Sequence, residues 1–137
     1  MPPAARAATV LHAVLFAGLA AIGGAFILVM HLQGGPLVSG AGAIGYVLAA
    51  AGVATLGYAA LAVRPRIPER AAGQATDEYW RDGNNRGPAV LVWLLCEGAG
   101  VIGWVGYLIT GMLVATVPAV LGLVALLAYG PSRLAGE

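Results

Sequence analysis

Hydrophobic residues fill this chain in four long runs, and most polar residues lie between the runs or beyond them. The runs are Thr9–Leu32, Gly40–Val63, Pro88–Ile109 and Met112–Tyr129. A helix needs about 20 apolar residues to cross a bilayer core, whereas a membrane-spanning strand has about 10 residues of alternating polarity. These runs do not alternate, and their length is helical. The pattern predicts an all-α integral membrane protein, with residues 1–137 forming a single domain of four transmembrane helices.

The connections between the runs differ in charge. Residues 33–39 and 110–111 contain no Arg or Lys, whereas residues 64–87 contain five of the seven arginines. The remaining two, Arg6 and Arg133, precede the first run and follow the last. Basic residues are retained on the cytoplasmic side of a membrane. We therefore expect two helical hairpins joined by a cytoplasmic loop, with both termini in the cytoplasm, in a bacterial cytoplasmic (inner) membrane.

The loop 64–87 has the composition of a solvated connector. Prolines at the beginning of this loop terminate the helix of the second run. Glu69–Trp80 predicts a short surface helix that places Tyr79 and Trp80 at the membrane interface. Asp82–Gly87 is rich in Gly, Asn and Asp, which predicts a turn before the third run.

Small residues recur at a spacing of about four in three of the runs. Apolar burial gives helices little reason to associate in lipid, so close approach through Gly and Ala stabilises their packing. We expect some rows to pack within the bundle and at least one to face another subunit, in a homo- or hetero-oligomer. The rows are Ala13, Ala17, Ala21 and Ala25 in the first run, Ala41, Gly45 and Ala49 in the second, and Ala99, Gly103 and Gly106 in the third.

Glu97 is the single acidic or basic side chain within the four runs, His aside. It lies roughly 13 Å into a helix that starts at Pro88, where a charge costs on the order of 2.5–3.5 kcal/mol on insertion scales. Such a residue is either an ion-binding carboxylate or an interhelical hydrogen-bonding group, and both interpretations remain open. At the same depth in the second run, Thr55 is the expected partner, with Tyr58 one turn nearer the cytoplasm.

The third run resembles the carboxylate helix of the rotary-ATPase proteolipid, the c subunit. Glu97 is followed six residues later by Gly103, and then by the aliphatic Val105 and Leu108. The second run is similar to the glycine-rich helix of that family, and its exit, Ala62–Arg66, to the Arg- and Pro-containing cytoplasmic loop. The resemblance covers about half of the chain. It implies that Glu97 is the ion-binding carboxylate of a turning ring.

Two histidines lie near opposite ends of the first run. His12 and His31 are separated by about 28 Å along a helix, so they cannot both be axial ligands of one haem. Each one alone is a candidate ligand for a haem or a chlorophyll-type pigment, or a neutral interfacial histidine with a water or carbonyl partner. No cofactor is predicted beyond that contact.

Composition narrows the function further. The chain is 60% hydrophobic and 9% charged, against about 25% charged residues in soluble domains, which excludes a water-soluble globule. A net charge of +1 gives no basis for nucleic-acid binding. No nucleophile–base set, metal-ligand cluster or phosphate-binding loop is present in the sequence, so we expect no enzyme. Pro118, inside the fourth run, predicts a kink, a freed backbone carbonyl group or simply a packing feature.

The expected function is that of a small non-catalytic accessory subunit. It would contact the lipid bilayer and pack through its Gly and Ala helix faces into a larger bacterial membrane complex. The first alternative is a proteolipid-like proton carrier that uses Glu97. The second is a pigment- or haem-contacting subunit that uses His12 or His31.

Overall fold

The computed structural model describes residues 3–136, which form helices joined by short loops and contain no strand. The longer helices are α1 (Pro3–Gln33), α2 (Gly42–Tyr58), α4 (Gly83–Thr110) and α5 (Val117–Ala128). Helix α2 continues through a π-helical turn, η1 (Ala59–Val63), and a 3-10 turn, η2 (Arg64–Arg66). The short elements are α3 (Thr76–Arg81), the 3-10 turn η3 (Leu113–Thr116) and α6 (Pro131–Leu134). The all-helical prediction is confirmed.

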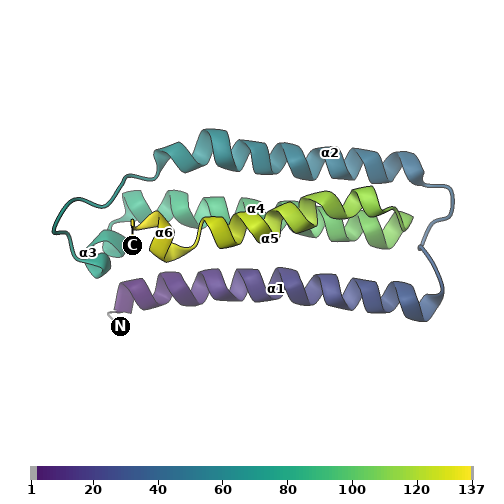
Figure 1. Ribbon diagram of the computed structural model, residues 1–137, viewed down its shortest axis with the longest axis horizontal. Helices are drawn as coiled ribbons and strands as arrows, with labels where there is room; N and C mark the ends of the chain where they lie inside the picture. Colours follow the sequence, from purple (N-terminus) through teal and green to yellow (C-terminus); the bar gives the residue numbers. More distant parts are fainter. Residues whose placement is uncertain (1–2, 137) are drawn as a thin grey trace.

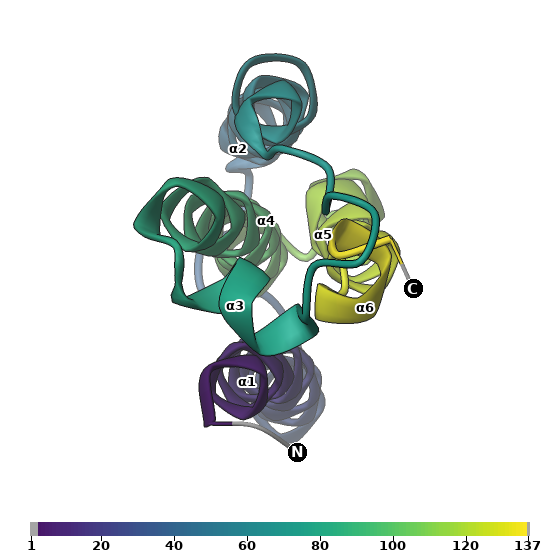
Figure 2. The same cartoon turned by 90° about the vertical axis from the view of Figure 1, so that its left-hand side faces the viewer.

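Helix α4 lies at the centre of the bundle and packs against α1, α2 and α5. Figure 2, which looks along the bundle, shows α1 and α2 on opposite sides of α4, with α5 beside it. The sequence did not predict how the two expected hairpins pack against each other. The first two helices run antiparallel, as Figure 1 shows, but α4 and α5 lie between them.

Glycines on different faces of α4 explain its central place. A Cβ atom on Gly100 would lie 2.5 Å from a methyl group of Leu19 in α1, and one on Gly106 would lie 3.3 Å from Cβ of Leu48 in α2. A Cβ on Gly103 would lie 2.7 Å from the backbone nitrogen of Ala119 in α5. Each neighbour thus approaches α4 more closely than a side chain would allow, which is the packing that helices use in lipid.

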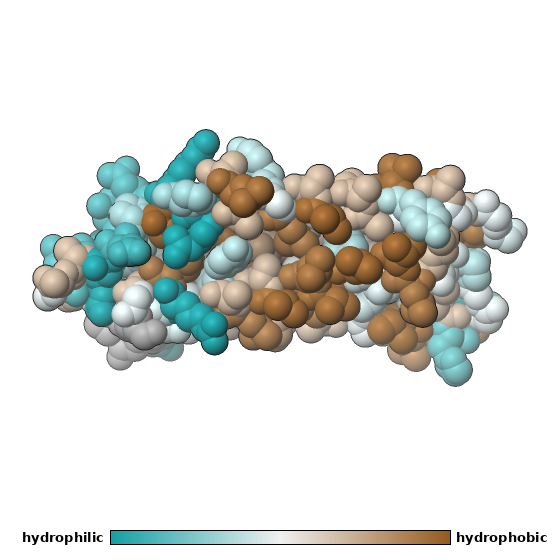
Figure 3. Space-filling view, turned by 45° about the horizontal axis from the view of Figure 1, so that its top comes forward, coloured by the Kyte–Doolittle hydropathy of each residue, from teal (hydrophilic) through white to brown (hydrophobic). Residues whose placement is uncertain are grey.

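Within residues 3–136, three helical segments are long and apolar enough to cross a membrane: α1, the continuous stretch Gly42–Arg66, and α4. The fourth run forms a shorter apolar helical segment, Leu113–Ala128. Pro118 lies where this segment changes from the 3-10 turn η3 to α5, in the first turn of α5, and it is buried against Gly52 of α2. Hydrophobic side chains cover the middle of the bundle on the face shown in Figure 3, as suits a surface that would contact lipid.

One end of the bundle is polar. The start of α1, η2 with the loop after it, and helices α3 and α6 gather there (Figure 1), and the seven arginines belong to these segments or to the adjoining start of α4. The opposite end holds the α1–α2 linker and the tight turn at Gly111. In that linker, the N–H groups of Leu37 and Val38 donate to the carbonyl oxygens of Leu108 and Ile109, at 3.2 and 3.0 Å. The linker thereby satisfies carbonyl groups at the end of α4.

The predicted turn at residues 82–87 is wrong, because α4 begins at Gly83 and Pro88 lies inside the helix. Asp82 caps this helix, and its Oδ1 accepts a hydrogen bond of 2.9 Å from the backbone N–H of Asn84. Asn85 is also buried, and its Nδ2 donates to the carbonyl oxygen of Tyr79 at 2.9 Å. The cap and this side-chain contact stabilise residues 83–87 as the first turn of the helix, although their Gly and Asn content favours a non-helical turn.

Candidate functional site

Glu97 lies at the middle of α4, at one edge of the face that packs against α1. Its side chain is half-buried, and a Cβ atom on Gly18 of α1 would lie 3.8 Å from its Oε1. Within residues 3–136 the carboxyl group has no hydrogen-bond or ion-pair partner. The next residue, Gly98, has open space where a side chain would begin. Glu97 is thus a polar group at the rim of a helix pair, flanked by small residues.

The interface beside Glu97 is tightly packed. His12 of α1 and Trp93 of α4 make an edge-to-face ring contact, with 5.2 Å between ring centroids. Further along, the indole ring of Trp104 lies against Gly23, and a Cβ atom there would be 2.7 Å from Nε1. The Trp104 N–H is buried without a partner in the described part of the chain. Aromatic rings therefore close the α1–α4 interface above and below Glu97, and the carboxyl group is left at its outer edge.

The predicted pairing of Thr55 and Tyr58 with Glu97 does not occur in the structure. The Thr55 hydroxyl donates to the carbonyl oxygen of Ala51 in its own helix, at 2.9 Å, and Tyr58 is 53% exposed. Glu97 lies near α1, and α2 lies on the other side of α4 (Figure 2). The sequence predicted the position of Glu97 along its helix, but it did not predict the direction in which the side chain points.

The predicted packing residues of the second and third runs lie mostly inside the chain. Gly45 of α2 faces Thr110, whose Oγ1 would be 3.0 Å from a Cβ atom. Ala49 and Ala99 are buried, Gly103 and Gly106 contact α5 and its preceding turn, and Ala41 is half-buried just before α2. These residues stabilise the bundle, and Gly103 in particular is buried against α5 and η3.

The small-residue row of α1 behaves differently. Its members, Ala13, Ala17, Ala21 and Ala25, are all exposed. Two neighbours on the same side of the helix, Ala20 and Gly24, are exposed as well, and no atom lies within 4 Å of a Cβ position on Gly24. Of the three predicted rows, this is the one whose residues do not pack against other helices of the chain.

The structure gives His12 a packing role. Its Nε2 lies 2.8 Å from the carbonyl oxygen of Leu126 in α5, so Nε2 carries the proton and donates to that oxygen. Together with the contact to Trp93, this bond joins α1, α4 and α5. His31 is exposed near the opposite end of α1. The two histidines are not brought together, and the Nε2 atom of His12 is not free to bind a haem or pigment metal.

The loop 64–87, predicted to be a solvated connector, contains a buried polar site. Asp77 of α3 accepts hydrogen bonds on Oδ1 from the backbone N–H groups of Ala4 and Ala5, at 2.7 and 3.2 Å. Its Oδ2 forms an ion pair of 2.6 Å with Arg81. Asp77 thus caps the first turn of α1, where N–H groups lack partners and a negative charge is favoured. The Asp–Arg spacing on one helix was the available sequence signal.

Tyr79 and Trp80 are fully buried, so they pack inside the protein and do not form the exposed aromatic anchors expected of a surface helix. The Tyr79 hydroxyl donates to the carbonyl oxygen of Pro68 at 2.9 Å, and Trp80 lies 5.8 Å from Trp93 between ring centroids. Burial raises the pKa of the Tyr79 phenol, more than the nearby guanidinium of Arg64 lowers it. These rings fill the polar end of the bundle and attach α3 to the core.

Comparisons with known protein families, with curated protein sequences and with solved structures give no match to this chain.

Proposed function

We propose that this protein is a small accessory subunit that associates laterally with another membrane protein through the outer face of α1. The exposed row Ala13, Ala17, Ala21 and Ala25 carries this proposal. The row is about 18 Å long, more than half of a bilayer core of about 30 Å. A partner helix can approach its backbone closely over that length, whereas most residues of the predicted rows in the second and third runs are buried within the chain.

Cysteine cross-linking in the native membrane tests this association. Cys96 is buried, so Cys96→Ala provides a background for single cysteines at exposed positions. We expect Ala17→Cys and Ala21→Cys to cross-link to a partner subunit, and Ala54→Cys, an exposed alanine on α2, to remain uncross-linked. Equal cross-linking at all three positions would reject the α1 face as the interface. Cross-linked mass distinguishes a second copy from a different protein.

A steric test complements cross-linking. Ala17→Leu enlarges a side chain on the proposed interface, and Ala54→Leu makes the same change on α2. Both positions are exposed, so neither change disturbs the bundle. We expect Ala17→Leu to reduce co-purification of the partner, because close helix approach in lipid depends on small residues. Co-purification at the level of Ala54→Leu would contradict the proposal.

A second candidate function is proton carriage by Glu97. It is supported by the half-exposed carboxyl group at the rim of the α1–α4 interface, without a partner in residues 3–136. A carboxyl group that lacks a structural partner in the membrane interior is available to bind a proton or a donor from a partner. The resemblance of α4 to the proteolipid carboxylate helix points in the same direction.

Carbodiimide labelling and transport assays test this candidate. We expect a hydrophobic carbodiimide to modify Glu97, and Glu97→Gln to abolish proton flux into liposomes that contain the native assembly. Glu78→Gln, which changes an exposed acid of α3, is the matched control. Flux in Glu97→Gln equal to that of the control would reject proton carriage, and it would leave the accessory role as the function of the chain.

We further propose that both termini lie in the cytoplasm of a bacterial inner membrane. The arginines gathered at one end of the bundle support this orientation. A reporter active only in the periplasm, fused after residue 136, is expected to be inactive. The same reporter inserted into the linker at Gly40 is expected to be active. The reverse pattern of reporter activity would show that the topology is the opposite of the one proposed.

A further inference from the structure

Two hollows follow one another along the side of the bundle, between the α2 segment and α5–α6. The first is an apolar groove of about 370 Å³ between residues 53–60 and residues 121–129, with Cys96 among its lining residues. The second is a polar cavity of about 510 Å³ at the arginine-rich end of the bundle. Gly57 of the groove has no atom within 4 Å of its Cβ position, so the space beside it is open.

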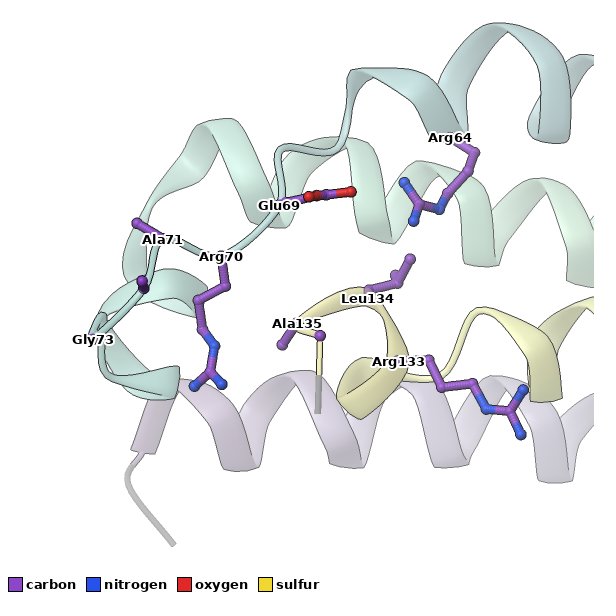
Figure 4. Close-up of a pocket in the computed structure, with 10 residues that line it drawn as sticks. Arg64, Glu69, Arg70, Ala71, Gly73, Arg133, Leu134 and Ala135 are labelled. Carbon is purple, nitrogen blue, oxygen red and sulfur yellow. The ribbon is translucent and has the colours of Figure 1, made fainter.

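The groove and the cavity are adjacent in the structure. Ala60 lines the groove, and Arg64, about one helical turn further along the same segment, lines the cavity. On the other side, Tyr129 lines the groove and Arg133 lines the cavity. A molecule that enters between these segments therefore meets an apolar surface in the groove and the guanidinium group of Arg64 at its end, whereas the guanidinium group of Arg133 points away from Arg64 (Figure 4).

Among the described residues, the lining of the cavity has more basic than acidic side chains. Arg64, Arg70 and Arg133 line it, and Glu69 is the acid that residues 3–136 contribute. In Figure 4 the guanidinium group of Arg64 and the carboxylate of Glu69 point toward one another. Arg70 is engaged, because its NH1 donates to Thr76 Oγ1 at 2.9 Å.

Arg64 is the group best placed to bind a ligand. It is half-buried, and it makes no hydrogen bond or ion pair with any residue in the range 3–136. A buried or half-buried guanidinium group is a strong donor to phosphate oxygens, which it can contact through two parallel N–H groups. Leu134 and Ala135, both buried, close the cavity on the α6 side.

We propose that this pair of hollows binds one anionic phospholipid. One acyl chain lies in the groove between α2 and α5, and the phosphate group contacts Arg64, with Arg133 at the rim of the same cavity. The charge at the end of the groove selects this ligand, because basic clusters at a membrane surface attract anionic lipid headgroups. A soluble anion accounts for the cavity but leaves the groove unused, and an apolar molecule accounts for the groove alone.

Lipid binding to the purified full-length chain tests the proposal. Native mass spectrometry of the delipidated protein in detergent measures the dissociation constants of dioleoyl phosphatidylglycerol and dioleoyl phosphatidylcholine, which have identical chains. We expect phosphatidylglycerol to bind at least about fivefold more tightly, the effect of roughly one basic contact near a membrane surface. Arg64→Gln is expected to remove this preference. Arg86→Gln, at an exposed arginine outside the cavity, is expected to retain it.

The groove is tested separately. Gly57→Leu fills open space between α2 and α5, and Gly24→Leu adds the same side chain at an open position of α1 outside the groove. We expect Gly57→Leu to weaken the binding of both lipids and Gly24→Leu to weaken neither. Circular dichroism of both variants verifies that the helices are retained.

Three outcomes would overturn the proposal. Equal affinity for the two lipids would reject the headgroup site, as would a preference that survives in Arg64→Gln. Displacement of phosphatidylglycerol by an equal concentration of glycerol 3-phosphate would show a site for soluble phosphate. Equal binding by Gly57→Leu and Gly24→Leu would reject the acyl-chain groove.

Discussion

Replacement of Asp77 is expected to destabilise the protein through the start of a helix that lies far away in sequence. Asp77 Oδ1 accepts hydrogen bonds from the N–H groups of Ala4 and Ala5, at 2.7 and 3.2 Å, and Oδ2 pairs with Arg81. Asp77→Ala removes all three contacts. We expect the free energy of unfolding to fall by about 2 kcal/mol.

The magnitude follows from the burial of each partner. Loss of a helix cap costs about 1 kcal/mol and up to about 2 in well-formed cases. The upper value applies here, because the Asp77 side chain is 11% exposed and the N–H of Ala5 is left buried. The Arg81 side chain is 67% exposed, so its ion pair adds only about 0.3–0.5 kcal/mol.

Unfolding in mixed micelles, followed by circular dichroism as the fraction of denaturing detergent rises, measures these changes. Arg81→Ala is expected to cost less than about 0.5 kcal/mol, and Asp77→Asn, which keeps one oxygen acceptor, about half of the full loss. Glu78→Ala changes an exposed acid on the same helix and serves as the control. The capping argument would be refuted if Asp77→Ala were no more destabilising than Glu78→Ala.

Two further predictions concern a helix contact and a buried phenol. Gly23→Ala would push a methyl group into the Trp104 ring and is expected to lower the free energy of unfolding by about 1–3 kcal/mol in the same assay. In Gly24→Ala the added methyl group meets no atom, so this variant is expected to be neutral or slightly stabilising. Equal effects of the two substitutions would contradict this packing. Burial raises the pKa of Tyr79 above its ordinary value of 10.0, so as the pH rises the phenol loses its proton in the unfolded chain before it does so in the folded chain. The contribution of this group to the free energy of unfolding is therefore expected to be constant below pH 10.0 and to fall above it. Unfolding measured from pH 8 to 11.5 should show a smaller fall in Tyr79→Phe than in Tyr58→Phe, and equal falls would contradict the buried state.

The sequence was sufficient to predict where the long helices lie, because apolar length alone identifies a membrane-spanning segment. It was not sufficient to predict their rotation. In an amphipathic helix the polar face reveals the direction of the core, but these runs are apolar on every side. Glu97 was therefore placed at the right depth and paired with Thr55 on the wrong neighbour. Gly103 likewise belongs to the predicted row of small residues, but the sequence did not show that this residue packs within the chain.

The loop 64–87 was predicted less well, for a different reason. Its polar composition predicted solvation, yet Asp77 and Trp80 are buried by contacts with segments that are distant in sequence. Such contacts have no periodic pattern from which they can be inferred. A tryptophan within a polar stretch and an Asp–Arg pair four residues apart were the local signals, and neither identifies the start of α1 as the partner.

The position of α4 between α1 and α2 has a consequence for biogenesis. Helices α1 and α2 are translated before the helix that separates them in the fold. Until α4 has been made, the faces of α1 and α2 that pack against it have no partner in the chain, and the amide groups at the start of α1 await a carboxylate that is translated some seventy residues later. The second half of the chain is therefore needed to complete the packing of the first.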